Sequence, residues 1–421
     1  MGSPVNKPLK NSIWTLLFVA SAIAWLPRIV AAWDNNSWSL TFIKRGSEGM
    51  VLDADLPSPP AEHPRALLWL ARAALADRDA QEALSLLRLY PSTSDPDALR
   101  VRAAALEAVG NFAGAVEAWR QAGDAVSLGA AAGRATRARR LDDALLAYRL
   151  AAEIRPEEGA QPLADFLQWS QRDPLAAQAV LEEALAFFPE STRRPSWLVR
   201  LGDVLCAQQQ WEQALAAYQQ ALTADAGLAS AHVGLGWVFY DGLNDQTTAE
   251  AEFRRAIGVD PRRGDGYAAM GDLLVRQEHY AEAEPWYAQA IERNPGNRWW
   301  QYSRANAVRA AGDNASALSL YENTVAKFPD FGEAYFELAL LQEASGDLNA
   351  AARSMDKALD LMAAPIAWHF DQAGRVYAAT GEWSRAADAY RHALALDASD
   401  GAASAGLEQV QAVLGDATPA P

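Results

Sequence analysis

Cysteine is almost absent from this sequence, which holds Cys206 as its only thiol in 421 residues. A single cysteine excludes an intramolecular disulfide framework and any metal centre built on several thiolates. It also suits an oxidising compartment, because no second thiol is present to mispair. Cys206 falls on an apolar helix without a nearby histidine, so we expect a buried small apolar residue rather than a nucleophile.

Positive charge is also scarce. The chain has 37 Lys and Arg against 53 Asp and Glu, which gives a formal net charge of −16. Nucleic-acid binding needs a basic surface that neutralises phosphates, so we predict no nucleic-acid partner. Residues 1–45 hold five basic residues and one acid, and the remainder therefore carries −20. That remainder should favour basic or neutral partners.

Motifs that bind nucleotides or activate a nucleophile are missing as well. The sequence has neither a Walker A loop nor a Gly-x-Ser-x-Gly elbow. Its five histidines are scattered, and none has a His or Cys partner at metal-ligand spacing. Carboxylate pairs such as Glu157-Glu158 are helix neighbours that point about 100° apart and cannot act together. We therefore expect no catalytic residue, no cofactor and no metal site.

An apolar run from Ile13 to Leu26 lies near the N-terminus, and a second apolar stretch continues to Trp33. Read as one helix, residues 13–33 form an uncleaved transmembrane signal anchor, about 30 Å long at 1.5 Å per residue. Trp14 and Trp33 then lie at the two membrane interfaces. Residues 1–12 form a cytoplasmic tail, and the rest of this single-pass membrane protein is extracytoplasmic.

The same run also fits a cleaved signal peptide. Its apolar core is then residues 13–26, with Val30-Ala31-Ala32 as a small-residue cleavage site. Pro27 ends the helix before that site. The mature chain is then secreted or periplasmic, and in both interpretations everything after residue 33 is exported.

Residues 34–64 form a distinct juxtamembrane segment. Trp38 to Ile43 is rich in β-prone residues, and residues 50–52 are apolar after two glycines. A small hairpin is one interpretation. The other is a simple stalk, since so short a β unit has little core of its own and a proline-rich linker follows it.

From residue 65 the sequence repeats. An alanine is followed four residues later by a large residue and three residues after that by a small one, so that the trio shares one helix face. Most steps between successive alanines are 34 or 35 residues, the period of a helix–turn–helix solenoid. The landmark alanines are Ala83, Ala115, Ala144, Ala177, Ala214, Ala249, Ala283, Ala317, Ala351 and Ala386.

A first helix precedes each landmark. It often carries a Leu-Gly pair, such as Leu201-Gly202 and Leu235-Gly236, and a turn such as Gly312-Asp313 separates it from the second helix. Prolines such as Pro261 end several units, because proline cannot continue a helix.

These motifs resemble the tetratricopeptide repeat (TPR) family over residues 65–400, most closely from Trp197 onward. The first four units depart from the pattern, with Ala131-Ala132 where Leu-Gly is expected. The resemblance implies an all-α, right-handed α-solenoid of about ten helix-turn-helix repeats, preceded by the N-terminal transmembrane or signal helix. Residues 401–414 are expected to form a capping helix, and residues 415–421 a disordered tail.

In this family the first helices line the concave surface on which peptides bind. With the same orientation in this chain, the residues two before, two after and five after the Leu of each Leu-Gly pair should face inward. The groove residues predicted in this way, with one more at a helix mouth, are Trp237, Tyr240, Trp299, Tyr302, Asn306, Arg309, Phe336, Trp368 and Arg375. The alternative is that many of these aromatic residues pack between repeats. Of Trp299-Trp300, one should pack and the other be exposed, since helix neighbours face different ways.

Together these features predict a non-catalytic scaffold for protein–protein interaction. It would be a membrane-anchored bacterial protein that takes a protein or peptide partner and assists the assembly of a cell-envelope complex. The alternative is an accessory protein that binds or exports envelope polysaccharide through an aromatic groove. Family resemblance speaks more to fold than to function, so the glycan alternative stays open.

Overall fold

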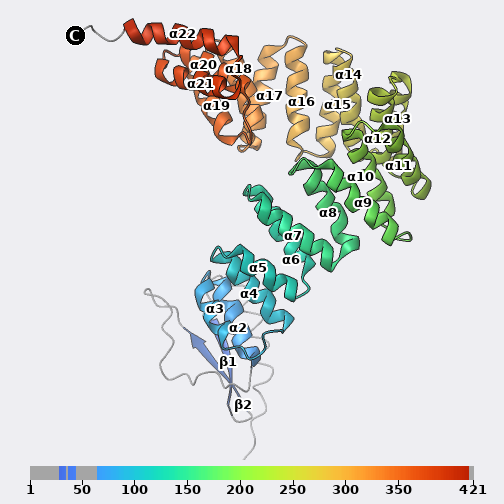
Figure 1. Cartoon of the computed structure of the whole chain (residues 1–421), viewed down its shortest axis with the longest axis vertical. Coiled ribbons are helices and arrows are strands. Elements are labelled where there is room, and N and C mark those ends of the chain that lie inside the picture. The colour runs from blue at the N-terminus through green and yellow to red at the C-terminus, as the bar shows by residue number, and fades with distance from the viewer. Residues whose placement is uncertain (1–27, 35–36, 44–63, 417–421) are drawn as a thin grey trace, which may run out of the picture. The chain divides into compact units, whose positions relative to one another are not determined.

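The computed structural model of the chain describes residues 28–34, 37–43 and 64–416 (Figure 1). Strand β1 (Arg28–Asp34) pairs antiparallel with strand β2 (Ser37–Ile43), and in this register Trp33 lies opposite Trp38. The β-prone segment 38–43 therefore lies in a strand. Its partner precedes it, whereas residues 50–52 lie outside the described residues.

The prediction of one helix over residues 13–33 is wrong at its C-terminal end. Residues 28–33 form most of β1, where β-branched Ile29 and Val30 suit a pleated pair and Pro27 separates them from the apolar run. The remainder of that segment, with Trp14, lies outside the described residues. Among the residues that are described, no helix is both long and apolar enough to cross a membrane.

The chain divides into two compact units. The first unit runs from Met1 to Phe188 and the second from Pro189 to Pro421. The helices of the first unit are α2 (Pro64–Ala76), α3 (Ala80–Arg88), α4 (Pro96–Ala108), α5 (Phe112–Gln121), α6 (Ala125–Arg137), α7 (Leu141–Ile154), α8 (Pro156–Trp169) and α9 (Pro174–Phe187). They pack as four successive pairs in chain order, so the departures from the sequence pattern do not break the pairing (Figure 1).

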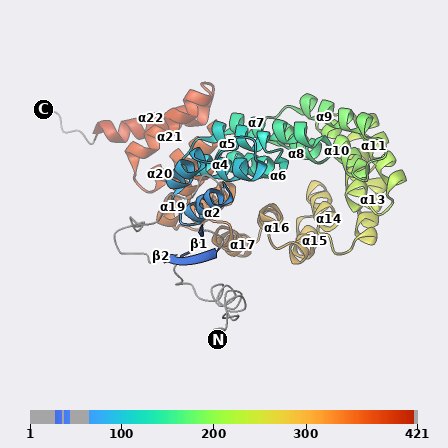
Figure 2. The ribbon, with the colours of Figure 1, turned by 90° about the horizontal axis from the view of Figure 1, so that it is seen from below.

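The second unit continues the same pairing. Its paired helices are α10 (Arg194–Ala207), α11 (Trp211–Ala224), α12 (Ala229–Trp237) with the π-helix η1 (Val238–Gly242), α13 (Gln246–Val259), α14 (Asp265–Arg276), α15 (Tyr280–Arg293), α16 (Arg298–Ala310), α17 (Asn314–Lys327), α18 (Gly332–Ala344), α19 (Leu348–Leu361), α20 (Ala367–Ala379) and α21 (Trp383–Leu396). A last helix, α22 (Gly401–Asp416), packs on α21. Figure 2 shows the successive pairs from α10 to α17 following one another in order. Consecutive helix pairs of this kind are the architecture of an α-solenoid.

The landmark alanines lie at the packing interface of each helix pair. All ten lie on second helices, and every one is fully buried. A methyl group lets two helix backbones approach closely, which a larger side chain would prevent. The helical pairing and the small-residue interface predicted from the repeat are confirmed.

The large landmark residue explains the Leu-Gly pair. The buried ring of Tyr218 on α11 lies against Gly202 of its own first helix and against Gly234 of the next one. A Cβ on Gly202 would meet that ring at 2.6 Å, and one on Gly234 would meet it at 2.3 Å. Tyr218 therefore joins its repeat to the next, and glycine is needed at both points of contact.

Each of the ten described turns within a pair contains one residue with a left-handed backbone. Four of these residues are glycines: Gly110, Gly312, Gly346 and Gly381. The other six are not glycine: Arg78, Arg139, Arg172, Gln209, Asn244 and Glu278. An aspartate or asparagine follows several of them and caps the second helix, as Asp313 does by accepting a hydrogen bond from the Ser316 backbone N–H at 3.0 Å. The turn geometry is therefore kept even where the sequence lacks its glycine.

One unit contains an extra residue. Leu235 and Ala249 are 14 residues apart, whereas the equivalent Met270 and Ala283 are 13 apart. The π-helix η1 lies between Leu235 and Ala249, and a single π turn inside an α-helix accommodates one added residue. Tyr240 therefore lies on η1 instead of on a regular first helix.

Candidate binding surface on the first helices

The nine residues predicted to line a groove all belong to first helices of the second unit or to η1. We call the set of positions that they occupy the first-helix face. They divide by element as follows: Trp237 on α12, Tyr240 on η1, Trp299, Tyr302, Asn306 and Arg309 on α16, Phe336 on α18, and Trp368 and Arg375 on α20. The contacts of each one decide what it offers to a partner.

A polar side chain on the first helix holds the tyrosine of its own pair in several repeats. Tyr218 donates its hydroxyl hydrogen to Asp203 at 2.7 Å, and Tyr287 donates to Asp272 at 2.6 Å. In the next repeat Tyr321 donates to Asn306. Asn306 was predicted to face a partner, but its carbonyl oxygen is committed to this internal bond. A buried hydroxyl needs such an acceptor, which explains the polar residue at this position.

An aromatic cluster covers the junction of α16 and α18. Trp299 packs edge-on against Phe331 and Tyr302, with ring centroids 4.9 and 6.1 Å away. Trp299 nevertheless remains 51% exposed, whereas Phe331 is buried. Its neighbour Trp300 lies against Gly264 of the preceding repeat. The prediction that one of the two tryptophans packs and the other is exposed is confirmed.

Phe336 does not line an open groove. It is 2% exposed and fills the joint between α18 and α20, with its ring centroid 5.0 Å from that of Trp368 and 4.8 Å from that of His369. Phe336 lies two residues before Leu338, and at this position its side chain faces the next first helix and not solvent. Trp368, which packs on Phe336, keeps 47% of its surface exposed. The aromatic surface exposed to a partner here is therefore the indole of Trp368.

Arg309 and Arg375 are paired with carboxylates of neighbouring first helices. An Nη of Arg309 lies 3.1 Å from a carboxylate oxygen of Glu337, and an Nη of Arg375 lies 2.5 Å from one of Glu343. Burial raises the pKa of Glu337. Both arginines bridge two repeats, so an anionic partner would have to compete with a carboxylate already in place.

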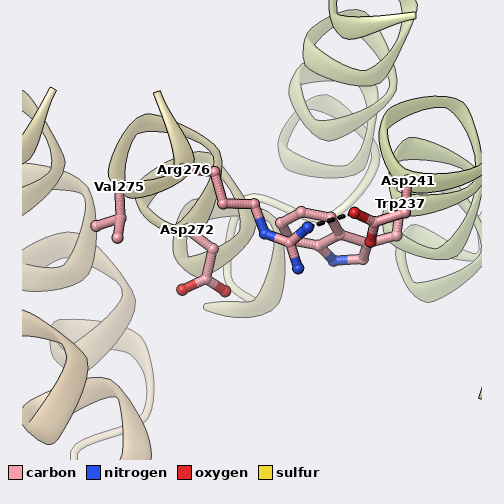
Figure 3. Close-up of a pocket in the computed structure, with 5 residues that line it drawn as sticks. All are labelled: Trp237, Asp241, Asp272, Val275 and Arg276. Atoms are coloured by element: carbon pink, nitrogen blue, oxygen red, sulfur yellow. Dashed lines mark hydrogen bonds and ion pairs between the residues drawn. The ribbon is translucent and has the colours of Figure 1, made fainter. Parts of the chain in front are cut away.

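A third bridge of this kind borders a pocket of about 410 Å³ between α12 and α14 (Figure 3). The guanidinium of Arg276 lies over the ring of Trp237, 4.6 Å from its centroid, and pairs with Asp241. Asp272 and Val275 complete the lining. Burial raises the pKa of Asp272, although the Tyr287 hydroxyl and the Arg276 charge oppose this. The pocket therefore carries two carboxylates and one internally paired cation.

The chemistry of the described residues offers little for catalysis. They contain no group of three or more His, Cys, Asp and Glu side chains arranged to hold a metal ion. Cys206 is partly buried, and burial raises the pKa of its thiol to about 11. A thiol protonated at neutral pH is a poor nucleophile.

The sequence prediction missed Asp241 and Glu337, whereas Glu343 lies five residues after Leu338, a position expected to face inward. Asp241, Glu337 and Glu343 each pair with an arginine 28 to 35 residues away. A separation near one repeat length places two residues on neighbouring first helices. This spacing is the sequence signal from which these ion pairs could have been predicted. Trp33, predicted as a membrane anchor, lies on β1 instead.

Three sequence models of tetratricopeptide repeats match this chain. One described as TPR repeat matches residues 202–242, and a tetratricopeptide repeat model matches 240–298, 268–315 and 302–364. A further tetratricopeptide repeat model matches residues 370–402.

A stretch of 150 residues, 34% of this chain, is 31% identical to cellulose synthase operon protein C of Xanthomonas axonopodis pv. citri (strain 306). It covers 9% of the Xanthomonas protein, so the chain spans less than a tenth of the length of this relative.

Two solved structures are among those that match. One is Pseudomonas aeruginosa PilF, at 19% identity and a TM-score of 0.45, over 52% of this chain and 98% of PilF. The other is the Cut9–Hcn1 hetero-tetramer of the APC/C, at 12% identity and a TM-score of 0.47, over 82% of this chain and 84% of the matched chain.

The repeat length, the buried small-residue landmark and the family models agree. The chain contains tetratricopeptide repeats between residues 202 and 402.

Proposed function

We propose that this protein is a non-catalytic scaffold that binds an extended segment of a protein partner on its first-helix face. The tetratricopeptide repeats that match within residues 202–402 are stacked helical pairs, and they support a role in protein binding. Assistance in the assembly of a cell-envelope complex is the finer form of this proposal.

The observation that carries the proposal is the pair of half-exposed tryptophans. Trp299 and Trp368 each expose about half of their surface, yet aromatic neighbours hold both rings in place. A large ring that is already fixed loses little conformational entropy on binding, and such residues dominate interface energies. Truncating an anchor of this type typically costs about 2 kcal/mol or more of binding free energy.

The charges around these rings favour a neutral or basic segment. Arg276, Arg309 and Arg375 are each paired with a carboxylate of an adjacent first helix. These pairs neutralise the arginines, and the chain as a whole carries −16. An acidic segment would meet repulsion, because these three arginines are already paired.

Peptide selection tests the proposal. Peptides selected from a displayed random library on the full chain should bind with a saturable isotherm. Trp299→Ala should weaken them at least tenfold, because it removes an anchor of the first-helix face. Phe187→Ala is the matched control, since Phe187 is a 70% exposed aromatic residue on the second helix α9. Equal losses in the two variants would contradict the proposal.

A second candidate is the binding of envelope polysaccharide. The relative named for a cellulose synthase operon favours it, although the match covers 9% of that protein. Exposed indoles also suit the flat faces of sugar rings. Retention of the full chain on immobilised cellulose, lost in the Trp299→Ala/Trp368→Ala double variant, would support this candidate over a peptide partner.

We also propose that the apolar run 13–26 carries the repeats across a membrane. Its length and the lysines before it support this role. Mass spectrometry of the protein purified from the membrane and soluble fractions of its host separates the two forms. A membrane-bound chain that retains residues 1–33 is an anchored protein, and a chain that begins near residue 33 is an exported one.

A further inference from the structure

A pocket of about 490 Å³ lies where the last repeat meets α22, apart from the pocket beside Trp237. The end of α21 and the turn into α22 contribute Leu396, Asp397 and Asp400, while Ile366 and Trp368 come from the start of α20. We call it the Trp368 pocket.

Three apolar side chains of the pocket are largely exposed. Ile366 is the last residue before a first helix and is 59% exposed, whereas Phe331, at the equivalent position one repeat earlier, is buried. Leu396 is likewise 59% exposed. Together with the indole of Trp368 they form one contiguous apolar wall that nothing in the described chain covers.

The pocket lining also contains two carboxylates, those of Asp397 and Asp400. Asp397 accepts hydrogen bonds from the Ser399 hydroxyl at 2.6 Å and its backbone N–H at 2.9 Å, and Asp400 accepts from the Ala403 N–H at 3.0 Å. These bonds involve Oδ1 of each carboxylate, and Oδ2 makes none with the described residues. The Ser399 bonds lower the pKa of Asp397, which keeps it ionised at neutral pH.

A buried carboxyl nearby is affected by the charge of Asp400. Asp371 on α20 is 8% exposed, and its pKa is raised first by burial and then by the charge of Asp400. No lysine or arginine lines the Trp368 pocket to offset these carboxylates. A pocket that combines apolar side chains with two hydrogen-bonded carboxylates is complementary to a side chain with a hydrocarbon stem and a cationic head.

We propose that the Trp368 pocket binds a lysine or arginine side chain of a peptide partner. The stem lies along Ile366 and Leu396, and the cationic head lies between the indole and the carboxylates of Asp397 and Asp400. Cation–π attraction and charge-assisted hydrogen bonds supply the recognition. The inference rests on the proposed function in one respect, that the occupant belongs to a peptide.

The test compares two fluorescein-labelled peptides on the full chain by anisotropy. One has the sequence Gly-Gly-Leu-Arg-Leu-Gly-Gly, and in the other citrulline, a neutral isostere, replaces arginine. The arginine peptide should bind saturably, and the citrulline peptide at least tenfold more weakly. Trp368→Ala and the double variant Asp397→Asn/Asp400→Asn should each weaken the arginine peptide at least tenfold. Asparagine keeps the turn and the helix cap while it removes the charge.

Two controls match these variants. Phe187→Ala removes a 70% exposed aromatic side chain from the second helix α9, outside the first-helix face. Asp313→Asn/Asp347→Asn removes two charges from other helix caps of the same unit. Both should leave the affinity for the arginine peptide within about twofold.

Three outcomes would overturn the inference: equal affinity for the two peptides, equal losses in the controls, or no saturable binding up to roughly 1 mM, a very weak affinity. Peptides selected for the first-helix face depend on Trp299. If those peptides bind while the arginine and citrulline peptides do not differ, only the present inference fails and the proposed function stands.

Discussion

At the scale of single residues, the buried tyrosine found in several pairs accounts for part of the polar pattern on the first helices. Its hydroxyl takes aspartate as acceptor in two repeats, at Asp203 and Asp272, and asparagine in a third, at Asn306. The hydrogen bond is common to all three, so the negative charge of the aspartates is not needed for packing.

The buried carboxylate of Asp272 should therefore make stability depend on pH. Its folded pKa is raised by burial, so the contribution of Asp272 to stability is full below about pH 4 and is lost as pH rises through the folded pKa. Asp272→Asn keeps an acceptor for Tyr287 and removes the charge. The difference in unfolding free energy, variant minus wild type, should increase over that pH range. Urea denaturation of the full chain at several pH values measures it, and a flat difference would contradict the account.

Phe336 and Trp368 were predicted to play the same role, and the structure separates them. Phe336→Ala should cost about 3–5 kcal/mol of unfolding free energy, because it empties a buried joint. Trp368→Ala removes a half-exposed ring and should cost about 1 kcal/mol, the typical value of an aromatic pair. Urea denaturation measures both, and equal losses would show that Trp368 is a packing residue.

At the scale of elements, the left-handed residue in each turn could be predicted from the sequence only where that residue is glycine. Glycine marked four turns, such as that at Gly312, while residues such as Glu278 adopt the same conformation without any sequence signal. Tertiary packing of the two helices imposes the turn, and the unfavourable backbone is tolerated there.

Relieving that strain should stabilise the protein. Glu278 is exposed and left-handed, so Glu278→Gly should raise the unfolding free energy by about 1 kcal/mol. Gly312→Ala should lower it by a similar amount. Glu322→Gly, at an exposed position inside α17, is the control and should destabilise by about 1 kcal/mol. Chemical denaturation decides, and a destabilising Glu278→Gly would refute the assignment of strain.

The elements were predictable to different degrees. The second helices followed from the landmark alanines, because burial of a small residue repeats with the structure. The strand β1 was missed, since Ile29 and Val30 belong to an apolar stretch whose length alone suggested a helix. The pairing partners of Arg309 and Arg375 needed the superposition of neighbouring repeats, which a single sequence only implies.

At the scale of the whole molecule, each repeat depends on its neighbours for burial. The ring of Tyr390 lies against Gly374 of its own pair and against Gly406 of α22, and Ala403 and Val410 of α22 are buried. The final helix thus completes the core of the last repeat.

A chain that ends at residue 400 should therefore unfold at a lower urea concentration than the full chain. Loss of α22 exposes the aromatic core around Tyr390, and the second unit should show the change. A chain that ends at residue 416 keeps α22 and serves as the control. Identical midpoints for all three chains would show that α22 contributes nothing to the array.

The central claim is that the first-helix face, rather than the second-helix surface, holds the partner. Photocrosslinking tests it most directly: benzoylphenylalanine placed at position 299 on α16, or at exposed position 322 on α17 of the same pair, is irradiated with a library-selected peptide. The account predicts a crosslink from position 299 and none above background from position 322. Crosslinking from position 322 alone, or equally from both, would contradict it.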